Sequence, residues 1–260
     1  MEGINGNCAL KVMVDPMYGA GAGYMEHILC NLGHNVLTIH SEQPFCGQLS
    51  PEPKEENLGN LAAAVRESRA DLGIALDGDG DRFGFIGPDG NYISPNQVFT
   101  VYADYMADHS AEHPAFARTV ATTHMIDRVA EKAGIKMIET PVGFKYLAQA
   151  MLNEGAVLGA EESGGLGVNR EIPEKDGIVA GLLLIGILSA YDITLPELMA
   201  MLRAKYGQLY SKRVDFYCTA AAKARVLAVL TTNPPDQLAG RKLIQIQRLD
   251  GVKMVLSDGA

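Results

Sequence analysis

The chain has no Cys-x-x-Cys pair, no run of basic residues and no long apolar segment. Its cysteines, Cys8, Cys30, Cys46 and Cys218, are scattered, which predicts reduced, mostly packed thiols and argues against metal ligation by them. With 22 basic and 31 acidic residues, the net charge of −9 argues against binding to nucleic acid or to an anionic membrane surface. No signal peptide is evident, and the most apolar expected helix, 178–190, is too short to span a bilayer. We therefore expect a soluble, cytoplasmic protein.

The length and the hydrophobic pattern predict an α/β protein. At 260 residues and 47% hydrophobic, the chain can bury one large core or two modest ones, so at least two domains are expected. Strand and helix patterns alternate through most of the chain and give way to alternating strands near its end. We predict two successive α/β sandwich domains with mixed sheets, at residues 1–112 and 113–210. Residues 211–260 are interpreted as the start of an incomplete α+β portion.

A glycine-rich turn follows the first expected strand, residues 10–14, and opens a helix over residues 24–32. Gly19, Gly21 and Gly23 invite a dinucleotide-binding interpretation. The spacing does not fit, because the third glycine of that motif would have to stand at Tyr24 or at Glu26. The preferred alternative is a helix N-terminus packed closely against its strand.

The most distinctive stretch is residues 73–83, where an apolar run ends in three carboxylates spaced two residues apart. The run Ile74–Leu76 reads as a short buried strand, and Asp77, Asp79 and Asp81 follow it, separated by glycines. Glycine allows backbone angles closed to other residues, so the alternate carboxylates can converge on one point. Three such oxygens repel one another unless a cation neutralises them, and a set of oxygen ligands in a compact loop suits Mg²⁺ best.

Three interpretations of this loop compete with a phosphate-handling magnesium site. An EF-hand would need Gly in place of Arg82 and Glu in place of Pro88. A functionless acidic turn is the plain structural alternative. A phosphatase of the haloacid-dehalogenase type would use Asp77 as nucleophile, but that motif prefers Thr or Val at residue 81. Arg82, with its permanently charged fork, favours a phosphate beside the ion.

Two further loops stand downstream in a fixed order, Thr140-Pro-Val-Gly143-Phe-Lys145 and Glu161-Glu-Ser163-Gly-Gly165. With the Asp loop, they make the chain resemble the α-D-phosphohexomutases, in particular bacterial phosphoglucomutase and phosphomannomutase. The resemblance covers nearly the whole chain. It implies a Mg²⁺ cofactor held by Asp77, Asp79 and Asp81, with Arg82 near the transferring phosphate.

The same resemblance implies a substrate site. Glu161 and Ser163 would bind sugar hydroxyls, since a carboxylate that accepts two hydroxyl hydrogens reads stereochemistry. The turn containing Thr140 and Gly143 would also contact substrate. Lys145 would contact phosphate or transfer a proton, the alternative being a surface lysine. His124 would serve in acid/base work, the alternative being a histidine at a strand end.

By this resemblance the full enzyme would interconvert hexose 1-phosphate and hexose 6-phosphate through a phosphoserine. Its partners would be a phosphorylated hexose and glucose 1,6-bisphosphate as activator, with glucose and mannose both open. The chain contains no serine followed by His-Asn and no Arg-x-Ser-Gly-Thr turn. We therefore expect a fragment that covers the second and third domains of the family and the start of the fourth, inactive alone. A non-catalytic sugar-phosphate-binding module is the remaining alternative.

Overall fold

The computed structural model describes residues 8–41, 50–110, 114–168 and 171–257. Its first sheet has the strand order β2-β1-β3-β4-β5. In chain order these strands are β1 (Lys11–Asp15), β2 (Asn35–Thr38), β3 (Leu72–Leu76), β4 (Phe83–Ile86) and β5 (Tyr92–Ile93). β1 is parallel to β2 and β3, whereas β4 is antiparallel to both β3 and β5. The sheet is therefore mixed, as the sequence predicts.

Alternate residues of the central strands face opposite layers. Val12 and Val14 pack into one hydrophobic cluster, and Met13 between them packs into another, because successive strand side chains point to opposite faces. Helix α2 (Gly59–Ser68), preceded by the short 3-10 helix at Glu55–Asn57, covers the Met13 face. Helix α1 (Tyr24–Asn31) packs on the other face. Burial on both faces explains why β3 is apolar throughout.

The second sheet repeats this plan with the strand order β7-β6-β8-β9. Its strands are β6 (Ala115–Thr119), β7 (Lys136–Thr140), β8 (Ala156–Glu161) and β9 (Gly165–Gly167), of which only β9 is antiparallel. Helix α4 (Met125–Ala133) connects β6 to β7, and α5 (Phe144–Glu154) connects β7 to β8. The α/β class with mixed sheets is thus confirmed.

The sequence pattern predicts a strand over residues 118–121, and this was wrong, since β6 begins at Ala115 and ends at Thr119. The segment Ala115-Phe-Ala117 carries one bulky apolar residue and two alanines, which have low strand propensity. Parallel neighbours on both sides and full burial impose the strand conformation there. Tertiary context overrides local preference at this position.

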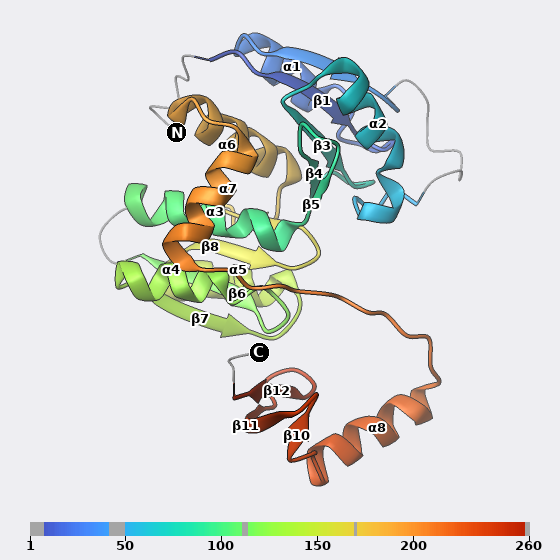
Figure 1. The fold of residues 1–260 in the computed structure, drawn as a ribbon, viewed down its shortest axis with the longest axis vertical. Coiled ribbons are helices and arrows are strands. Elements are labelled where there is room, and N and C mark those ends of the chain that lie inside the picture. Colours follow the sequence, from blue (N-terminus) through green and yellow to red (C-terminus); the bar gives the residue numbers. More distant parts are fainter. Residues whose placement is uncertain (1–7, 42–49, 111–113, 169–170, 258–260) are drawn as a thin grey trace.

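Three helices lie between the two sheets and bury a common core: α3 (Pro95–His109), α6 (Gly177–Tyr191) and α7 (Leu195–Tyr206) (Figure 1). Helix α6 is apolar around most of its circumference because it contacts α1, α3, β3 and β9. Among the described residues no helix alone has the length and apolarity to cross a membrane. Only α6 and α7 taken together do, and they are bent by 84° at the break between them.

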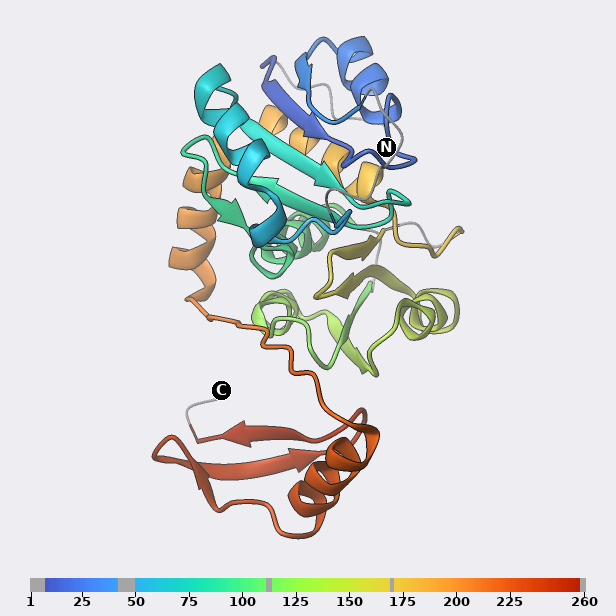
Figure 2. The same cartoon turned by 90° about the vertical axis from the view of Figure 1, so that its right-hand side faces the viewer.

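The C-terminal unit is a helix and a small antiparallel sheet, reached through residues 207–219, which contain no helix or strand. It comprises α8 (Ala220–Thr232), β10 (Gln237–Leu238), β11 (Arg241–Gln247) and β12 (Lys253–Leu256). Both views show this unit set apart from the larger sheets (Figures 1 and 2). It touches them through an ion pair between Lys253 and Glu139 and a hydrogen bond of 2.8 Å from the Val142 amide to Asp250.

The prediction of mostly packed thiols was wrong for the cysteines that the structure describes. Cys8, Cys30 and Cys218 are free cysteines. Cys30 and Cys218 are exposed to solvent and Cys8 is half-buried, so none of the three is packed in a core. Cys46 lies outside the described residues.

The helix layer offers a direct test of its packing. The hydroxyl of the fully buried Tyr102 donates a hydrogen bond of 2.8 Å to the carbonyl of Ala180, which ties α3 to α6. Replacing Tyr102 by Phe should lower the free energy of unfolding by about 1 kcal/mol, the usual net value of such a bond. The measurement is urea unfolding of both proteins. Tyr191→Phe, at a position 47% exposed, is the matched control and should leave the unfolding free energy unchanged.

Candidate metal and sugar-phosphate site

The Asp loop joins β3 to β4 at the carboxyl end of β3. Asp77 is completely buried, Asp81 is half-buried and Asp79 is exposed. One oxygen from each of the three lies within 4.8 Å of the others. Gly80 has a φ of +79°, a left-handed angle that folds the loop back so that the carboxylates converge. The predicted ligand set is therefore assembled in one place.

Two cations of the chain partly balance these charges. The Arg82 Nε lies 2.5 Å from Asp77 Oδ2, and Asp77 Oδ1 accepts hydrogen bonds from the amides of Asp81 and Arg82 at 2.9 and 3.0 Å. The Lys175 Nζ lies 2.8 Å from Asp81 Oδ2. Burial, together with the charges of Asp77 and Asp79, raises the pKa of Asp81, while Lys175 opposes the rise. Three carboxylates therefore face two cationic side chains, Arg82 and Lys175, and one negative charge stays unbalanced.

The loop fits a hard divalent ion. Asp81 Oδ1 is buried and has no hydrogen-bond partner among the described residues. A buried carboxylate oxygen without a partner is costly, and a cation supplies the missing interaction. Three carboxylates and no nitrogen or sulfur donor favour Mg²⁺, which would leave positions open for oxygens of a phosphate.

The Glu161 turn connects β8 to β9. Glu161 is 8% exposed, whereas Glu162 and Ser163 are half-buried. A side chain at Gly165 would meet Glu161 Oε2 at 3.2 Å and Lys175 Cδ at 3.1 Å. Glycine at that position thus leaves room for the Glu161 carboxylate and for the Lys175 stem. Lys175 passes beside the Glu161 turn and ends on the Asp loop.

The two loops are joined backbone to backbone. The Phe83 amide donates to the Gly164 carbonyl at 3.3 Å, Arg82 and Gly165 form a β-bridge, and the Gly177 amide donates to the Gly80 carbonyl at 3.0 Å. A side chain at Gly164 would come within 2.7 Å of the Phe83 carbonyl oxygen. The Asp loop and the Glu161 turn, far apart in sequence, therefore lie side by side.

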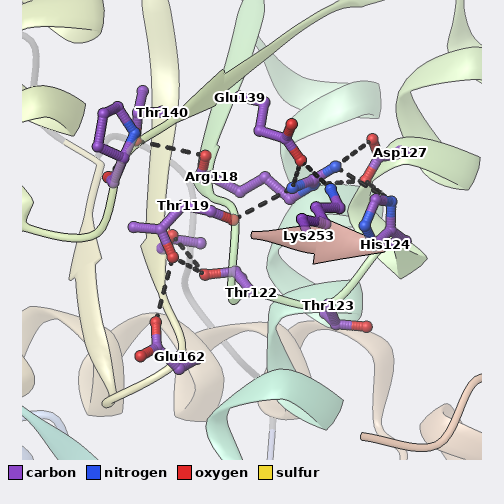
Figure 3. A network of polar contacts seen from close by, with 12 residues as sticks. Arg118, Thr119, Thr122, Thr123, His124, Asp127, Glu139, Thr140, Glu162 and Lys253 are labelled. Carbon is purple, nitrogen blue, oxygen red and sulfur yellow. Dashed lines mark hydrogen bonds and ion pairs between the residues drawn. The ribbon is translucent and has the colours of Figure 1, made fainter. Parts of the chain in front are cut away.

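Arg118 organises a second polar network near this site (Figure 3). Its side chain is 3% exposed and forms ion pairs with Asp127 at 2.6 Å and Glu139 at 2.7 Å. Its Nη2 donates to His124 Nδ1 at 3.1 Å. Because that nitrogen must accept, the proton of a neutral His124 resides on Nε2. Lys253 of the C-terminal unit also contacts Glu139.

Of the remaining predicted residues, Thr140 contacts this network, and none has a contact with the Asp cluster that is found within the described part of the chain. Thr140 is buried and bonds to backbone carbonyls of Arg118 and Pro141. Gly143 has a φ of +125° and precedes α5. Lys145 is exposed, with its Nζ 4.9 Å from the Tyr146 ring centre. Their substrate and proton-transfer roles stay predictions.

The network does reach the sugar turn. The Thr119 hydroxyl donates to Glu162 Oε2 at 3.1 Å and bonds to the Thr122 hydroxyl at 2.9 Å. Arg213, in the segment before α8, lies 3.8 Å from Glu162 Oε1. Sequence reasoning gave Arg118, Lys175 and Arg213 no role. For Lys175, the need for a cation near the three carboxylates of the Asp loop was a signal that the sequence offered.

Comparison with known proteins gives consistent matches. The family model "Phosphoglucomutase/phosphomannomutase, alpha/beta/alpha domain II" matches residues 4–90, and the model for domain III of the same family matches residues 94–206. A phosphoglucomutase/phosphomannomutase of Thermococcus kodakarensis is 31% identical over 250 residues, which are 95% of this chain and 52% of that protein. A probable phosphoglucosamine mutase of Methanosarcina acetivorans is 29% identical and covers 100% of this chain and 56% of that protein.

Among solved structures, pp63/parafusin, a phosphoglucomutase from Paramecium, superposes with a TM-score of 0.79 at 26% identity. The match covers 98% of this chain and 50% of that one. The chain thus spans about half the length of these relatives.

The junction of the two loops can be tested with glycine substitutions. Gly164 has a φ of +100°, so Gly164→Ala forces an alanine into a left-handed backbone conformation. Its added Cβ would also clash with the Phe83 carbonyl. Gly134→Ala is the control, since Gly134 also has a positive φ but nothing within 4 Å. The control should cost about 1–2 kcal/mol of unfolding free energy. Gly164→Ala should cost clearly more and shift the amide resonances of Arg82 and Phe83. Equal costs with unchanged resonances would contradict the junction.

The Arg118 network predicts the titration of His124. Burial and the charge of Arg118 lower the pKa of His124, Lys253 lowers it further, and Asp127 raises it. In NMR titrations the imidazole should therefore titrate below about 6.5. Lys253→Met should raise the pKa and Asp127→Asn should lower it. The pKa of His124 is lower in the folded protein than in the unfolded chain. The contribution of His124 to stability is therefore present above the unfolded pKa and is lost as the pH falls through that pKa toward the folded one. A pKa unmoved by either substitution would show that the network is absent in solution.

Proposed function

Because the chain belongs to the phosphoglucomutase/phosphomannomutase family, we propose that it carries the metal-binding and sugar-reading loops of a phosphohexomutase. Such an enzyme interconverts hexose 1-phosphate and hexose 6-phosphate. The observation that supports the proposal most directly is the backbone junction between the Asp loop and the Glu161 turn. It puts a site suited to Mg²⁺ beside a site suited to sugar hydroxyls.

In this proposal Asp77, Asp79 and Asp81 hold Mg²⁺, which supplies charge neutralisation for phosphoryl transfer when bound. Arg82 keeps Asp77 in place through its Nε. Burial opposes its charge, but the hydrogen bond to Asp77 and the neighbouring acids raise the pKa of Arg82. Its guanidinium therefore stays charged, and a phosphate bound beside the ion would meet a permanent cation.

Glu161 and Ser163 are proposed to read the sugar. A largely buried carboxylate with a neighbouring hydroxyl can accept and donate hydrogen bonds to a pair of sugar hydroxyls. A hexose phosphate that turns over in two orientations presents equatorial hydroxyls to the same two groups each time. Glucose phosphates are the proposed substrates and mannose phosphates the second choice. Relatives named for glucose, mannose and glucosamine phosphates make this a choice within one chemical class.

The proposed reaction proceeds through a phosphoserine and a 1,6-bisphosphate, with glucose 1,6-bisphosphate as activator. The 260 residues contain no serine followed by His-Asn. We propose that this chain binds hexose phosphate and metal but does not interconvert the two phosphates alone. A cytoplasmic location is proposed with it, because the scattered cysteines offer no disulfide framework.

The contacts of Asp77 argue against the phosphatase alternative. An attacking carboxylate needs a free oxygen within reach of phosphorus. Asp77 is completely buried, one oxygen accepts two amides, and the other is paired with Arg82. These contacts support a ligand held in a fixed position.

The metal site is tested by titrating Mn²⁺, followed by electron paramagnetic resonance. Asp79→Ala should weaken binding by roughly tenfold or more, because a charged ligand contributes more than about 1.4 kcal/mol. Asp108→Ala, at an exposed acid on α3, is the control with equal loss of charge. Identical binding in all three proteins would show that the Asp loop is ordinary surface.

Turnover separates the two proposals, because a phosphatase of this type would hydrolyse an aryl phosphate and a mutase fragment would not. With Mg²⁺, the chain should not hydrolyse an aryl phosphate such as 4-nitrophenyl phosphate, nor interconvert glucose 1- and 6-phosphate in the presence of the bisphosphate. Hydrolysis that is lost in Asp77→Asn and kept in Asp81→Thr would identify Asp77 as a nucleophile. That result would overturn the mutase proposal, and absorbance at the nitrophenolate maximum measures it.

A further inference from the structure

A cavity of about 280 Å³ lies outside the proposed site. It is lined by the first turns of α3, the start of α4, the second half of α7 and residues 207–211. We call it the α3–α7 cavity. It belongs to none of the loops that the proposed function uses.

The α3–α7 cavity has one apolar wall and one polar, uncharged wall. Met125, Met199 and Leu202 provide apolar surface, while Asn96 and Thr100 provide hydrogen-bonding groups. No carboxylate lines it among the described residues, although the chain is strongly acidic. A ligand for this space needs an apolar body and at least one polar group.

Thr100 has an unused hydroxyl at the cavity. The residue is 6% exposed and lines the cavity, and none of the hydrogen bonds found in the described part of the chain involves its hydroxyl, which is not among the fully buried unpaired atoms. Helical threonines commonly donate to the carbonyl four residues earlier, and Thr231 and Thr232 do so at 2.7 and 2.9 Å. Thr100 forms no such bond, so its hydroxyl is left for a ligand or for water.

Among the described residues that line the cavity, Arg203 alone carries a charge. It follows Met199 by one helical turn on α7, so the two side chains share a face of that helix. It is exposed and forms no ion pair with any described residue. A planar guanidinium pairs best with a carboxylate, through two parallel hydrogen bonds. A monoanion matches this single cation, whereas a phosphate dianion would keep an unbalanced charge in an acidic protein.

We propose that the α3–α7 cavity binds a small carboxylic acid with an apolar body. The carboxylate lies on Arg203, the body lies against Met125, Met199 and Leu202, and a polar group on the ligand accepts from Thr100. This cavity shares no lining residue with the Asp loop or the Glu161 turn.

Occupancy would act on the segment that leads to the C-terminal unit. Asn96 accepts a hydrogen bond from the Thr123 amide at 3.1 Å and donates one to the Ser211 hydroxyl at 3.1 Å. A ligand against Asn96 therefore holds residues 207–211 to the start of α3. Arg213, two residues beyond Ser211, lies beside Glu162 of the sugar turn. The cavity is thus connected to the turn that reads the sugar.

The test uses the chain labelled with ¹³C at its methionine methyl groups, because Met125 and Met199 line the cavity. Three probes of one size are titrated: 3-phenylpropionate, 3-phenylpropanol and 3-phenylpropylamine. We expect the carboxylate to shift both methyl resonances with the highest affinity, the alcohol to bind more weakly and the amine not to bind. No shift of either methyl by the carboxylate, or equal affinity for the amine, would overturn the proposal.

One variant tests where the carboxylate binds, and two further variants serve as controls. Arg203→Met should weaken 3-phenylpropionate by roughly tenfold or more, as loss of a charge-assisted bond predicts, and should leave the alcohol unaffected. Thr100→Val keeps the side-chain volume and reports on folding through unchanged methyl resonances elsewhere. Arg225→Met, at an exposed arginine on α8, is the control. Equal loss in Arg203→Met and Arg225→Met would show non-specific attraction and would contradict the proposed site.

Discussion

The repulsion among three carboxylates in one five-residue loop is the constraint on which the site depends. Arg82 and Lys175 offset part of it, and they come from different places in the chain. Lys175 reaches the Asp loop only because the Glu161 turn and the start of α6 are hydrogen-bonded to that loop. A positive charge beside the three carboxylates thus depends on the packing of the Asp loop, the Glu161 turn and the start of α6 against one another. The same packing brings the Glu161 turn beside the three carboxylates.

Glycine makes this packing possible at the points of closest approach. Gly164 and Gly177 face backbone carbonyls of Phe83, Arg82 and Gly80 at distances that no side chain would allow. The mixed sheets set up the approach, because the antiparallel strands β4 and β9 begin directly after the two loops. Two sheets with a common helix layer between them then hold both loops against relative movement.

The sequence was sufficient to predict features whose signal is local. Asp77, Asp79 and Asp81 were identifiable because a buried strand, glycines and acids follow one another without interruption. Glu161 was identifiable from its turn and from resemblance. Arg118 was not, since its partners Asp127 and Glu139 are charged residues of ordinary amphipathic segments. Pairings between distant segments are set by the tertiary fold, and neither a hydrophobic period nor a local motif predicts them. The start of β6 was missed for the same reason.

The central claim is that the Asp loop and the Glu161 turn form one site, and paramagnetic relaxation tests it most directly. Mn²⁺ is paramagnetic and broadens the resonances of nearby amides, so its effects report proximity in solution and not only in the structure. The account predicts that substoichiometric Mn²⁺ broadens the amides of Glu161, Gly164 and Gly165 along with those of the Asp loop, and also the signals of added glucose 6-phosphate. Broadening confined to residues 77–82, with the turn and the sugar phosphate unaffected, would contradict it.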